Sequence, residues 1–240
     1  MSIPPGRTTA DVSNIVPIPK EYTHQTDLET IVTRYKTLRL KGLEENPEAF
    51  SSKYEDEVKF PYEKWLARVN NPQARTFIAL ALDTDQVGRK YDVADHLALL
   101  LSQEWLGTVT IVGPRILPED DKTLSKAPWD VFLPREVPVA SRGLFRNSTL
   151  TYMLGGMFVL EAGRRKGHAR RMIEQAVKEV RAEATGVGAS RALVVSITER
   201  NNDAARRLYE GCSFDVWDGE LVLQIPREQE CVAMVLDVQL

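Results

Sequence analysis

The chain is poor in cysteine and histidine. Its 240 residues include two cysteines, Cys212 and Cys231, and three histidines. Both cysteines fall at helix or strand positions that are expected to face a core, so we expect small buried thiols rather than a disulfide. His24, His96 and His168 are scattered, and none has a second histidine or cysteine at ligand spacing. The sequence therefore predicts no metal site.

Long apolar runs are also absent, although hydrophobic residues make up an ordinary 43% of the chain. No stretch approaches the about 20 apolar residues that a membrane helix requires. Residues 1–7 lack the apolar segment of a secretory signal. We therefore expect no membrane contact and a cytoplasmic location, with a nuclear location as the alternative. Residues 1–12 are expected to form a disordered tail.

A broad basic surface is missing as well. The formal net charge is −3, whereas a protein that binds nucleic acid over its whole surface usually carries an excess of positive charge. We therefore expect no nucleic-acid partner. Basic residues gather instead in one short segment, residues 164–171. Local positive charge on an acidic protein suits a small anionic cofactor.

This basic segment follows a hydrophobic strand pattern and opens a helix pattern. Gly167 and Ala169 are its small residues, and the cations beside them are Arg164, Arg165, Lys166, Arg170 and Arg171. The first N–H groups of a helix lack intrahelical partners and carry the positive end of its dipole, so an anion can approach a turn of small residues. The patterns of nucleoside-triphosphate and dinucleotide loops are absent. We expect a polyphosphate ligand here.

Two linked motifs carry a resemblance to a known family. The spacing Arg164-x-x-Gly167-x-Ala169 resembles the acyl-CoA pyrophosphate loop of the Gcn5-related N-acetyltransferases, the GNAT family. After a β-branched run at residues 191–197, residues 202–214 resemble the second signature of that family, Asn-x-x-Ala-x-x-Leu-Tyr-Glu followed by Gly-Phe. One position departs from it, because Ser213 stands where the family usually has glycine. The turn before Phe214 can therefore differ locally.

The resemblance implies an α+β fold, with a mixed, mostly antiparallel central sheet flanked by helices. In this fold two strands splay apart, and the acyl-CoA lies in the opening. We expect residues 13–240 to form one such domain, with an insertion at about residues 113–147 that is rich in proline and lacks any sustained period. The insertion is either a lid over the acceptor side or a packed decoration.

Periodicity and turn residues place the elements of this domain. Asp27 is expected to cap the first helix, and Gly155 and Gly156 are expected to form a bulge. The expected helices cover residues 27–43, 61–68, 167–184 and about 203–212. The expected strands cover residues 14–19, 76–82, 104–112, 149–160, 191–197, 213–217 and 230–238, with residues 83–91 as a long connection.

The resemblance also implies site residues. Acetyl-CoA is the expected cofactor, and Tyr209 is the expected acid that protonates the leaving thiolate. Asn202 is expected to cap the helix that follows it and to contact the cofactor. A backbone N–H of Val159 or Leu160 would face the thioester oxygen. The full set of expected cofactor contacts is Phe158, Val159, Leu160, Arg164, Arg165, Lys166, Gly167, His168, Ala169, Asn202 and Tyr209.

The general base is harder to place. Family members often have a glutamate early in the fourth strand, but residues 150–156 contain no carboxylate. Glu104 is our expected catalytic residue for this role, with Tyr152 and Glu199 as other candidates, acting directly or through water. A base is dispensable if the amine arrives with a depressed pKa.

The sequence therefore predicts an N-acetyltransferase. It would move an acetyl group from acetyl-CoA directly to a primary amine of a small molecule or protein within a ternary complex. The alternative is a non-catalytic module that binds or senses acyl-CoA, which the missing strand carboxylate favours. The expected oligomeric state is a monomer or homodimer.

Overall fold

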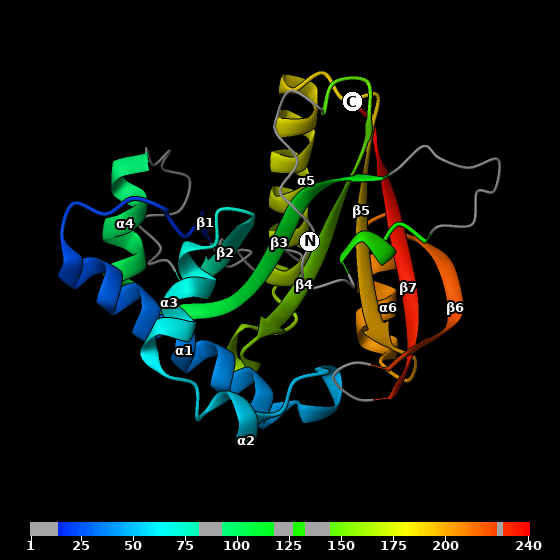
Figure 1. Cartoon of the computed structure of the whole chain (residues 1–240). Helices are drawn as coiled ribbons and strands as arrows, with labels where there is room; N and C mark the ends of the chain where they lie inside the picture. The colour runs from blue at the N-terminus through cyan, green and yellow to red at the C-terminus, as the bar shows by residue number, and fades with distance from the viewer. Residues whose placement is uncertain (1–13, 82–92, 118–126, 133–144, 225–227) are drawn as a thin grey trace, which may run out of the picture.

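The computed structural model describes residues 14–81, 93–117, 127–132, 145–224 and 228–240 (Figure 1). The expected tail, the connection at residues 83–91 and most of the expected insertion lie outside these ranges. The helices are α1 Gln25–Glu45, α2 Tyr54–Glu57, α3 Tyr62–Asn70, α4 Val93–Ser102, α5 His168–Gly186 and α6 Asp203–Glu210. The strands are β1 Asn14–Pro17, β2 Ala74–Leu80, β3 Trp105–Leu117, β4 Thr149–Val159, β5 Arg191–Glu199, β6 Asp215–Leu223 and β7 Gln229–Val238. Short 3₁₀ turns cover η1 Pro47–Ala49, η3 Asp130–Phe132 and η5 Glu161–Gly163.

The strands form one seven-stranded sheet in the order β1-β2-β3-β4-β5-β7-β6. Every neighbouring pair is antiparallel except β4 and β5, which run parallel. Helix α5 provides the crossover between these two strands, as a parallel pair requires. The expected α+β fold, a mostly antiparallel sheet flanked by helices, is confirmed.

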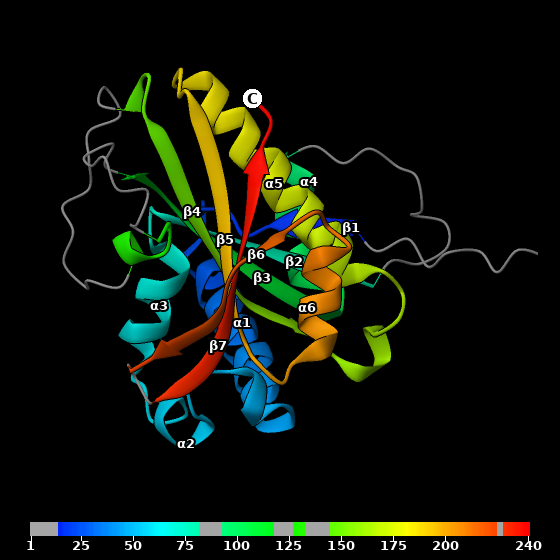
Figure 2. The ribbon, with the colours of Figure 1, turned by 90° about the vertical axis from the view of Figure 1, so that its right-hand side faces the viewer.

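The two faces of the sheet bury different clusters, because successive side chains of a strand point to opposite faces. On β2, Phe77 belongs to the cluster under α5, while Ile78 belongs to the cluster under α1, α3 and α4. Figure 2 shows α3 on one side of the strands and α5 on the other. The central strands of the sheet are therefore buried on both faces.

The described part of the expected insertion covers the C-terminal half of the sheet on the α1 side. Trp129, in the segment 127–132, is 3% exposed and packs with Leu193 and Val195 of β5 and Ala233 of β7. The Thr151 hydroxyl donates a hydrogen bond to the Pro128 carbonyl at 3.1 Å. This segment is therefore part of the core.

The N-terminal boundary of the expected insertion needs correction, because β3 continues to Leu117 instead of ending at Val112. The register of β3 against β4 shifts between Val112 and Arg115, and this irregularity accommodates Pro114 within the strand. The helix α4, Val93–Ser102, is a second difference, since no element was expected between the connection at residues 83–91 and the strand at residues 104–112. Leu99 and Leu100 bury its apolar side in the cluster under α1.

The helix caps also differ in part from expectation. His24 occupies the N-cap of α1, and Asp27 lies one turn inside, where its charge favours the positive end of the helix dipole. Asn202 caps α6 as expected, because its Oδ1 accepts a hydrogen bond from the Ala205 N–H at 3.0 Å.

Ser213 keeps the backbone conformation that suits a glycine, with φ of 66°. A left-handed conformation costs a non-glycine residue about 1–2 kcal/mol, whereas glycine adopts it readily. We therefore expect Ser213→Gly to raise the melting temperature by about 1–3 °C. The gain is small because glycine also has more conformational freedom than serine in the unfolded chain, which offsets part of the stabilisation. Thermal unfolding followed by circular dichroism measures the change.

Ser190→Gly is the matched control, since Ser190 is also exposed but has a negative φ. It should leave stability unchanged or lower it slightly. A destabilised S213G protein would show that the serine side chain is needed in this turn.

Candidate active site

Strands β4 and β5 part in the middle of the sheet. They pair from Thr149–Arg191 to Leu154–Ser196, and β4 then continues to Val159 without pairing with β5 (Figure 1). At this point β4 carries one extra residue opposite β3, and Gly156 adopts a φ of 63°. The expected bulge and the expected splayed strand pair are therefore present.

Where β4 separates from β5, some backbone groups of β4 face the opening between the two strands. The hydrogen bonds between β4 and β3 show which groups these are. The Leu160 N–H donates to the Leu106 carbonyl at 2.8 Å, so it points toward β3. Because backbone groups alternate along a strand, the N–H and C=O of Val159 point to the other side. The expectation that Leu160 could face the opening is therefore wrong, and Val159 is the residue that offers its N–H there.

The basic turn precedes α5 directly. Gly167 is the N-cap of α5, has a φ of 79° and provides no side-chain cap. A glycine at the N-cap offers no side-chain oxygen to the first N–H groups of α5, and an anion can take that place. Arg165 also adopts a positive φ, 63°, which directs the chain around this turn.

A cleft of about 820 Å³ opens between the splayed end of β4, the basic turn, α6 and the segment after α1. We call it the larger cleft. It is lined by Asn46, Ala49, Phe50, Met157, Phe158, Val159, Arg164, Arg165, Ala169, Asn202, Ala204, Ala205, Arg207 and Leu208. Six of the expected cofactor contacts are in this set: Phe158, Val159, Arg164, Arg165, Ala169 and Asn202. The others, Leu160, Lys166, Gly167, His168 and Tyr209, do not line it.

Arg164 crosses the mouth of the larger cleft. Its Nε donates to the Val159 carbonyl at 3.0 Å, and its Nη2 donates to Asn46 Oδ1 at 3.4 Å. The same nitrogen lies 4.0 Å from a carboxylate oxygen of Glu45. The side chain is 43% exposed, so these contacts are weak and exchange readily with a stronger anion.

Two other cations of the basic segment donate hydrogen bonds to backbone carbonyls and do not line the larger cleft. Arg170 donates to the Gly211 carbonyl at 2.6 Å. Arg171 donates to the Lys166 carbonyl at 3.0 Å. The Arg171 guanidinium lies beside Gly167, since a Cβ there would be 3.2 Å from its Nη1, and it adds positive charge at the basic turn.

Tyr209 lies inside the core. It is 4% exposed, its ring centroid is 5.3 Å from that of Phe214, and it lines neither of the cavities described here. Burial raises the pKa of its phenol, and the nearby Ser196 hydroxyl offsets part of the rise. Since Ser196 is the last residue of β5 that pairs with β4, the phenol lies near the point where the strands part.

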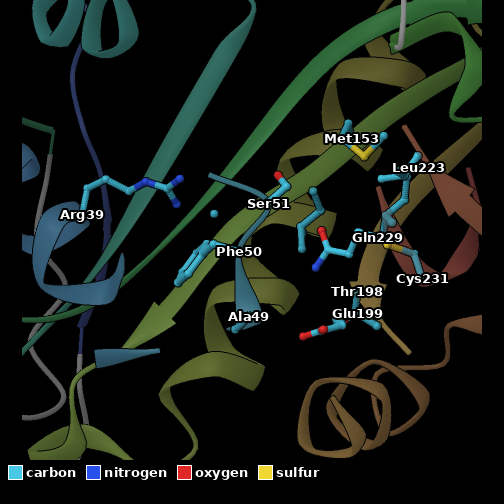
Figure 3. Close-up of a pocket in the computed structure, with 14 residues that line it drawn as sticks. Arg39, Ala49, Phe50, Ser51, Met153, Thr198, Glu199, Leu223, Gln229 and Cys231 are labelled. Carbon is cyan, nitrogen blue, oxygen red and sulfur yellow. The ribbon is translucent and has the colours of Figure 1, made fainter. Parts of the chain in front are cut away.

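A smaller pocket of about 210 Å³ lies on the α1 side of the parting (Figure 3). Its walls come from α1 and the segment after it, β4, β5 and the β6–β7 hairpin. Its lining residues are Arg39, Ala49, Phe50, Ser51, Met153, Leu154, Gly155, Gly156, Ile197, Thr198, Glu199, Leu223, Gln229 and Cys231. Ala49 and Phe50 also line the larger cleft, so the two cavities meet there.

The three candidate bases are far from equivalent in the structure. Glu199 lines the smaller pocket. Glu104 is exposed, precedes β3 and lines neither cavity. Tyr152 is fully buried, with the guanidinium of Arg75 5.8 Å from its ring centre. Burial is the main cause that raises the pKa of Tyr152 far above its usual value, so it cannot accept a proton from an amine.

Arg39 was not anticipated from the sequence, and it belongs to a charged cluster. Glu57, 1% exposed, accepts hydrogen bonds from Nε and Nη2 of Arg39 at 3.2 and 3.0 Å, and from Nη1 and Nη2 of Arg68 at 2.7 and 3.1 Å. Burial by itself would raise the pKa of Glu57, but the hydrogen bonds from Arg68 and Arg39 outweigh it and lower the pKa to about 2. Glu57 is therefore ionised at neutral pH.

The described parts of the chain contain no group of three side chains suited to a metal ion. Cys212 and Cys231 are both free thiols. Among the described helices, none has the length and apolar character to span a membrane.

Comparison with known proteins finds a family model that is similar to the central segment. Residues 116–214 match the model of the Acetyltransferase (GNAT) family. This segment runs from the end of β3 to the turn after α6, so it contains both sequence motifs. No curated protein matches the chain. The resemblance found in the sequence is confirmed over these residues.

Solved structures confirm the fold. The chain is similar to Arabidopsis thaliana NAA60 in complex with a bisubstrate analogue, with a TM-score of 0.51 at 16% identity over 94% of this chain and 100% of that one. It is also similar to NAA60 in complex with acetyl-CoA, with a TM-score of 0.50 at 15% identity over 95% and 99% of the two chains. A GNAT-family acetyltransferase from Streptococcus pneumoniae gives a TM-score of 0.50 at 13% identity over 94% and 100%. Identities this low show a shared fold only.

The charged cluster should make stability depend on acid pH. Because the pKa of Glu57 falls from 4.5 to about 2 on folding, its contribution is complete above about pH 4.5 and is lost as the pH falls toward 2. We expect Glu57→Gln to lower the free energy of unfolding by about 2–3 kcal/mol at pH 7. The difference from the parent should shrink between pH 4.5 and 2.

Urea unfolding at a series of pH values measures this dependence. Glu55→Gln serves as control, since Glu55 is exposed in the same helix, and it should match the parent throughout. A constant difference between E57Q and the parent from pH 7 to pH 2 would contradict the ionised, hydrogen-bonded state of Glu57.

Proposed function

We propose that this chain, whose central segment matches the GNAT family, is an N-acetyltransferase that uses acetyl-CoA and a primary amine. The observation that carries the proposal is the opening between β4 and β5. On one side of it the larger cleft leads to the uncapped N-terminus of α5, and on the other side the smaller pocket carries a carboxylate. An acyl carrier and an amine can therefore meet at the parting of the strands.

The larger cleft suits coenzyme A. A diphosphate would lie at the first N–H groups of α5, beside Arg164, Arg165 and Ala169. The Val159 N–H, which faces the opening, would donate a hydrogen bond to the amide-containing arm, and Asn202 lines the same path from α6. Acetyl-CoA, when bound, supplies the thioester whose acetyl group passes to the amine.

The smaller pocket suits the acceptor. Its junction with the larger cleft at Ala49 and Phe50 gives an amine access to the acetyl group. A protonated amine must lose a proton before it can attack a carbonyl carbon, and a carboxylate in the pocket can take that proton directly or through water. Glu199 lines the smaller pocket, whereas Glu104 lines neither cavity, and this supports Glu199 as the proposed base.

Tyr209 is the proposed acid for the thiolate that leaves. A raised pKa keeps the phenol protonated at neutral pH, so it can donate a hydrogen bond to the sulfur, whose negative charge draws the proton as the thiolate forms. Its place near Ser196, where the strands part, supports this role. The alternative, a module that binds acyl-CoA without catalysis, is favoured by the burial of Tyr209 away from both cavities.

Cofactor binding is tested at Gly167. An aspartate there would have to adopt the positive φ of 79° and would place a negative charge at the proposed diphosphate position. We expect Gly167→Asp to weaken the binding of coenzyme A at least about tenfold in a calorimetric titration. Gly186→Asp, which adds the same charge at the other end of α5 in open space, should bind coenzyme A like the parent. Equal affinity in all three proteins would refute the diphosphate site.

Catalysis is tested at Tyr209 by following thiol release from saturating acetyl-CoA with a panel of amines. Tyr209→Phe keeps the ring packing and removes the donor, so we expect normal melting and a kcat lower by roughly 100-fold. Tyr152→Phe removes the same group from another buried tyrosine outside both cavities and should turn over normally. If Y209F and the parent have the same kcat, Tyr209 is a core residue only. If no amine releases thiol, the chain binds acyl-CoA without acetylating amines.

A further inference from the structure

The smaller pocket is lined by two opposite charges that do not pair with each other, and the ion-pair partner of Arg39, Glu57, lies outside its lining. Arg39 enters from α1 on one side, and Glu199 lies on β5 on the other (Figure 3). A charge held at a partly desolvated wall is costly unless a partner binds it. These two side chains therefore indicate which charged groups the acceptor carries.

Arg39 has unused hydrogen-bonding capacity. Its Nε and Nη2 donate to Glu57, and its guanidinium lies 4.6 Å from the ring centre of Phe50. Among the described residues Nη1 donates to none, although the side chain is only 14% exposed. A guanidinium in this state is well suited to a carboxylate.

The surrounding cluster leaves this positive charge uncompensated. Two guanidinium groups, those of Arg39 and Arg68, surround the single carboxylate of Glu57, which is already fully ionised at neutral pH. The cluster therefore keeps a net charge of one cation, and Arg39 is the member that lines the pocket. Arg68 does not line it.

Glu199 is the complementary group. It forms no ion pair or side-chain hydrogen bond with the described part of the chain. The next cation in the sequence, Arg200, pairs with Glu230 at 3.1 Å and is not available to it. Glu199 can therefore hold the ammonium form of an amine and take up its proton.

The size of the pocket limits the acceptor. A volume of about 210 Å³ holds roughly seven waters and is below the about 300–1,000 Å³ of sites for drug-sized ligands. Between the two charges, Ser51, Thr198 and Gln229 provide polar groups, while Phe50 and Met153 provide apolar surface. This composition suits one small molecule with a polar head at each end.

We propose that the acceptor is a small zwitterion, an amine that also carries a carboxylate, of the size of a free amino acid. Its carboxylate binds Nη1 of Arg39, and its amine faces Glu199 near the junction with the larger cleft. This inference rests on the proposed acetyl transfer. In the reaction, Glu199 receives the proton that converts the ammonium to a neutral amine, the nitrogen forms a bond to the acetyl carbon, and the carbon–sulfur bond breaks. Coenzyme A leaves as a thiolate that takes a proton from Tyr209, and the second proton that the nitrogen loses restores the phenol.

The test compares alanine, leucine and methionine with their amides, which keep the amine and lose the carboxylate charge. Thiol release from saturating acetyl-CoA should give the amino acids a kcat/KM about 10- to 100-fold above that of the amides, since a charge-assisted hydrogen bond has that effect on affinity. Arg39→Gln should abolish this difference, because it should lower kcat/KM for the amino acids and leave that for the amides unchanged. The loss should come mainly from a higher KM.

Arg68→Gln is the matched control. Arg68 donates two hydrogen bonds to Glu57, as Arg39 does, but lies outside the pocket. It should lower the melting temperature by a similar amount and keep the preference for amino acids over amides. If R39Q does not fold, Arg39→Lys keeps the charge beside Glu57 and loses the planar fork, and should still reduce the preference.

A binding measurement separates this inference from the proposed function. Calorimetric titration of methionine into the protein saturated with coenzyme A should show binding that R39Q and Glu199→Gln both weaken. Three outcomes would overturn the proposal of a zwitterionic acceptor and leave acetyl transfer intact. They are an equal kcat/KM for amino acids and their amides, equal effects of R39Q and R68Q on the preference for amino acids, and a preference for peptides with the same first residue. Absence of thiol release from every amine would overturn both proposals.

Discussion

The parting of β4 from β5 is the constraint on which the rest of the site depends. A regular sheet would close the opening, because each free backbone group on β4 would find a partner on β5. The bulge at Gly156 turns β4 away, while β5 stays paired with β7 as far as Glu199 and Cys231. Helix α1 holds β4 on the other side, since Gly42 allows close approach to the ring of Phe158, 2.9 Å from where a Cβ would lie. The unpaired edge is thereby retained for a ligand.

The way the core is divided explains why two cavities meet at this parting. The face under α5 is one continuous cluster, which spans both halves of the sheet. The opposite face has two clusters, one under α1, α3 and α4 and one under Trp129. The smaller pocket lies between them, because Phe50 belongs to the first while Met153 and Ile197 pack against the second. The face under α5 is therefore packed without a break, whereas the opposite face has a gap between its two clusters that holds the smaller pocket.

The sequence predicted the features that depend on local chemistry. The turn at Gly167, the cap at Asn202 and the bulge at Gly156 all follow from residue types with few alternative roles. It did not identify Arg39 or place Glu199, since the first lies on α1 and the second on β5, far apart in the chain. Only the packing of α1 across the parted strands brings them to one pocket. A backbone detail, the direction of the Leu160 N–H, likewise required the pairing register of β3 and β4.

Charge is arranged differently at the two ends of the proposed site, for which the larger cleft is the cofactor end and the smaller pocket is the acceptor end. At the cofactor end, Arg164 and Arg165 are exposed and the contacts of Arg164 to Glu45 and Asn46 are weak, so a diphosphate can displace them at little cost. At the acceptor end, Arg39 is shielded from water and fixed by Glu57, so it cannot relax toward solvent. A fixed, shielded charge discriminates between ligands more strongly than an exposed one, because a ligand that lacks the opposite charge leaves it unpaired. The selectivity of this protein should therefore arise at the acceptor end, and its affinity for the larger ligand at the exposed basic turn.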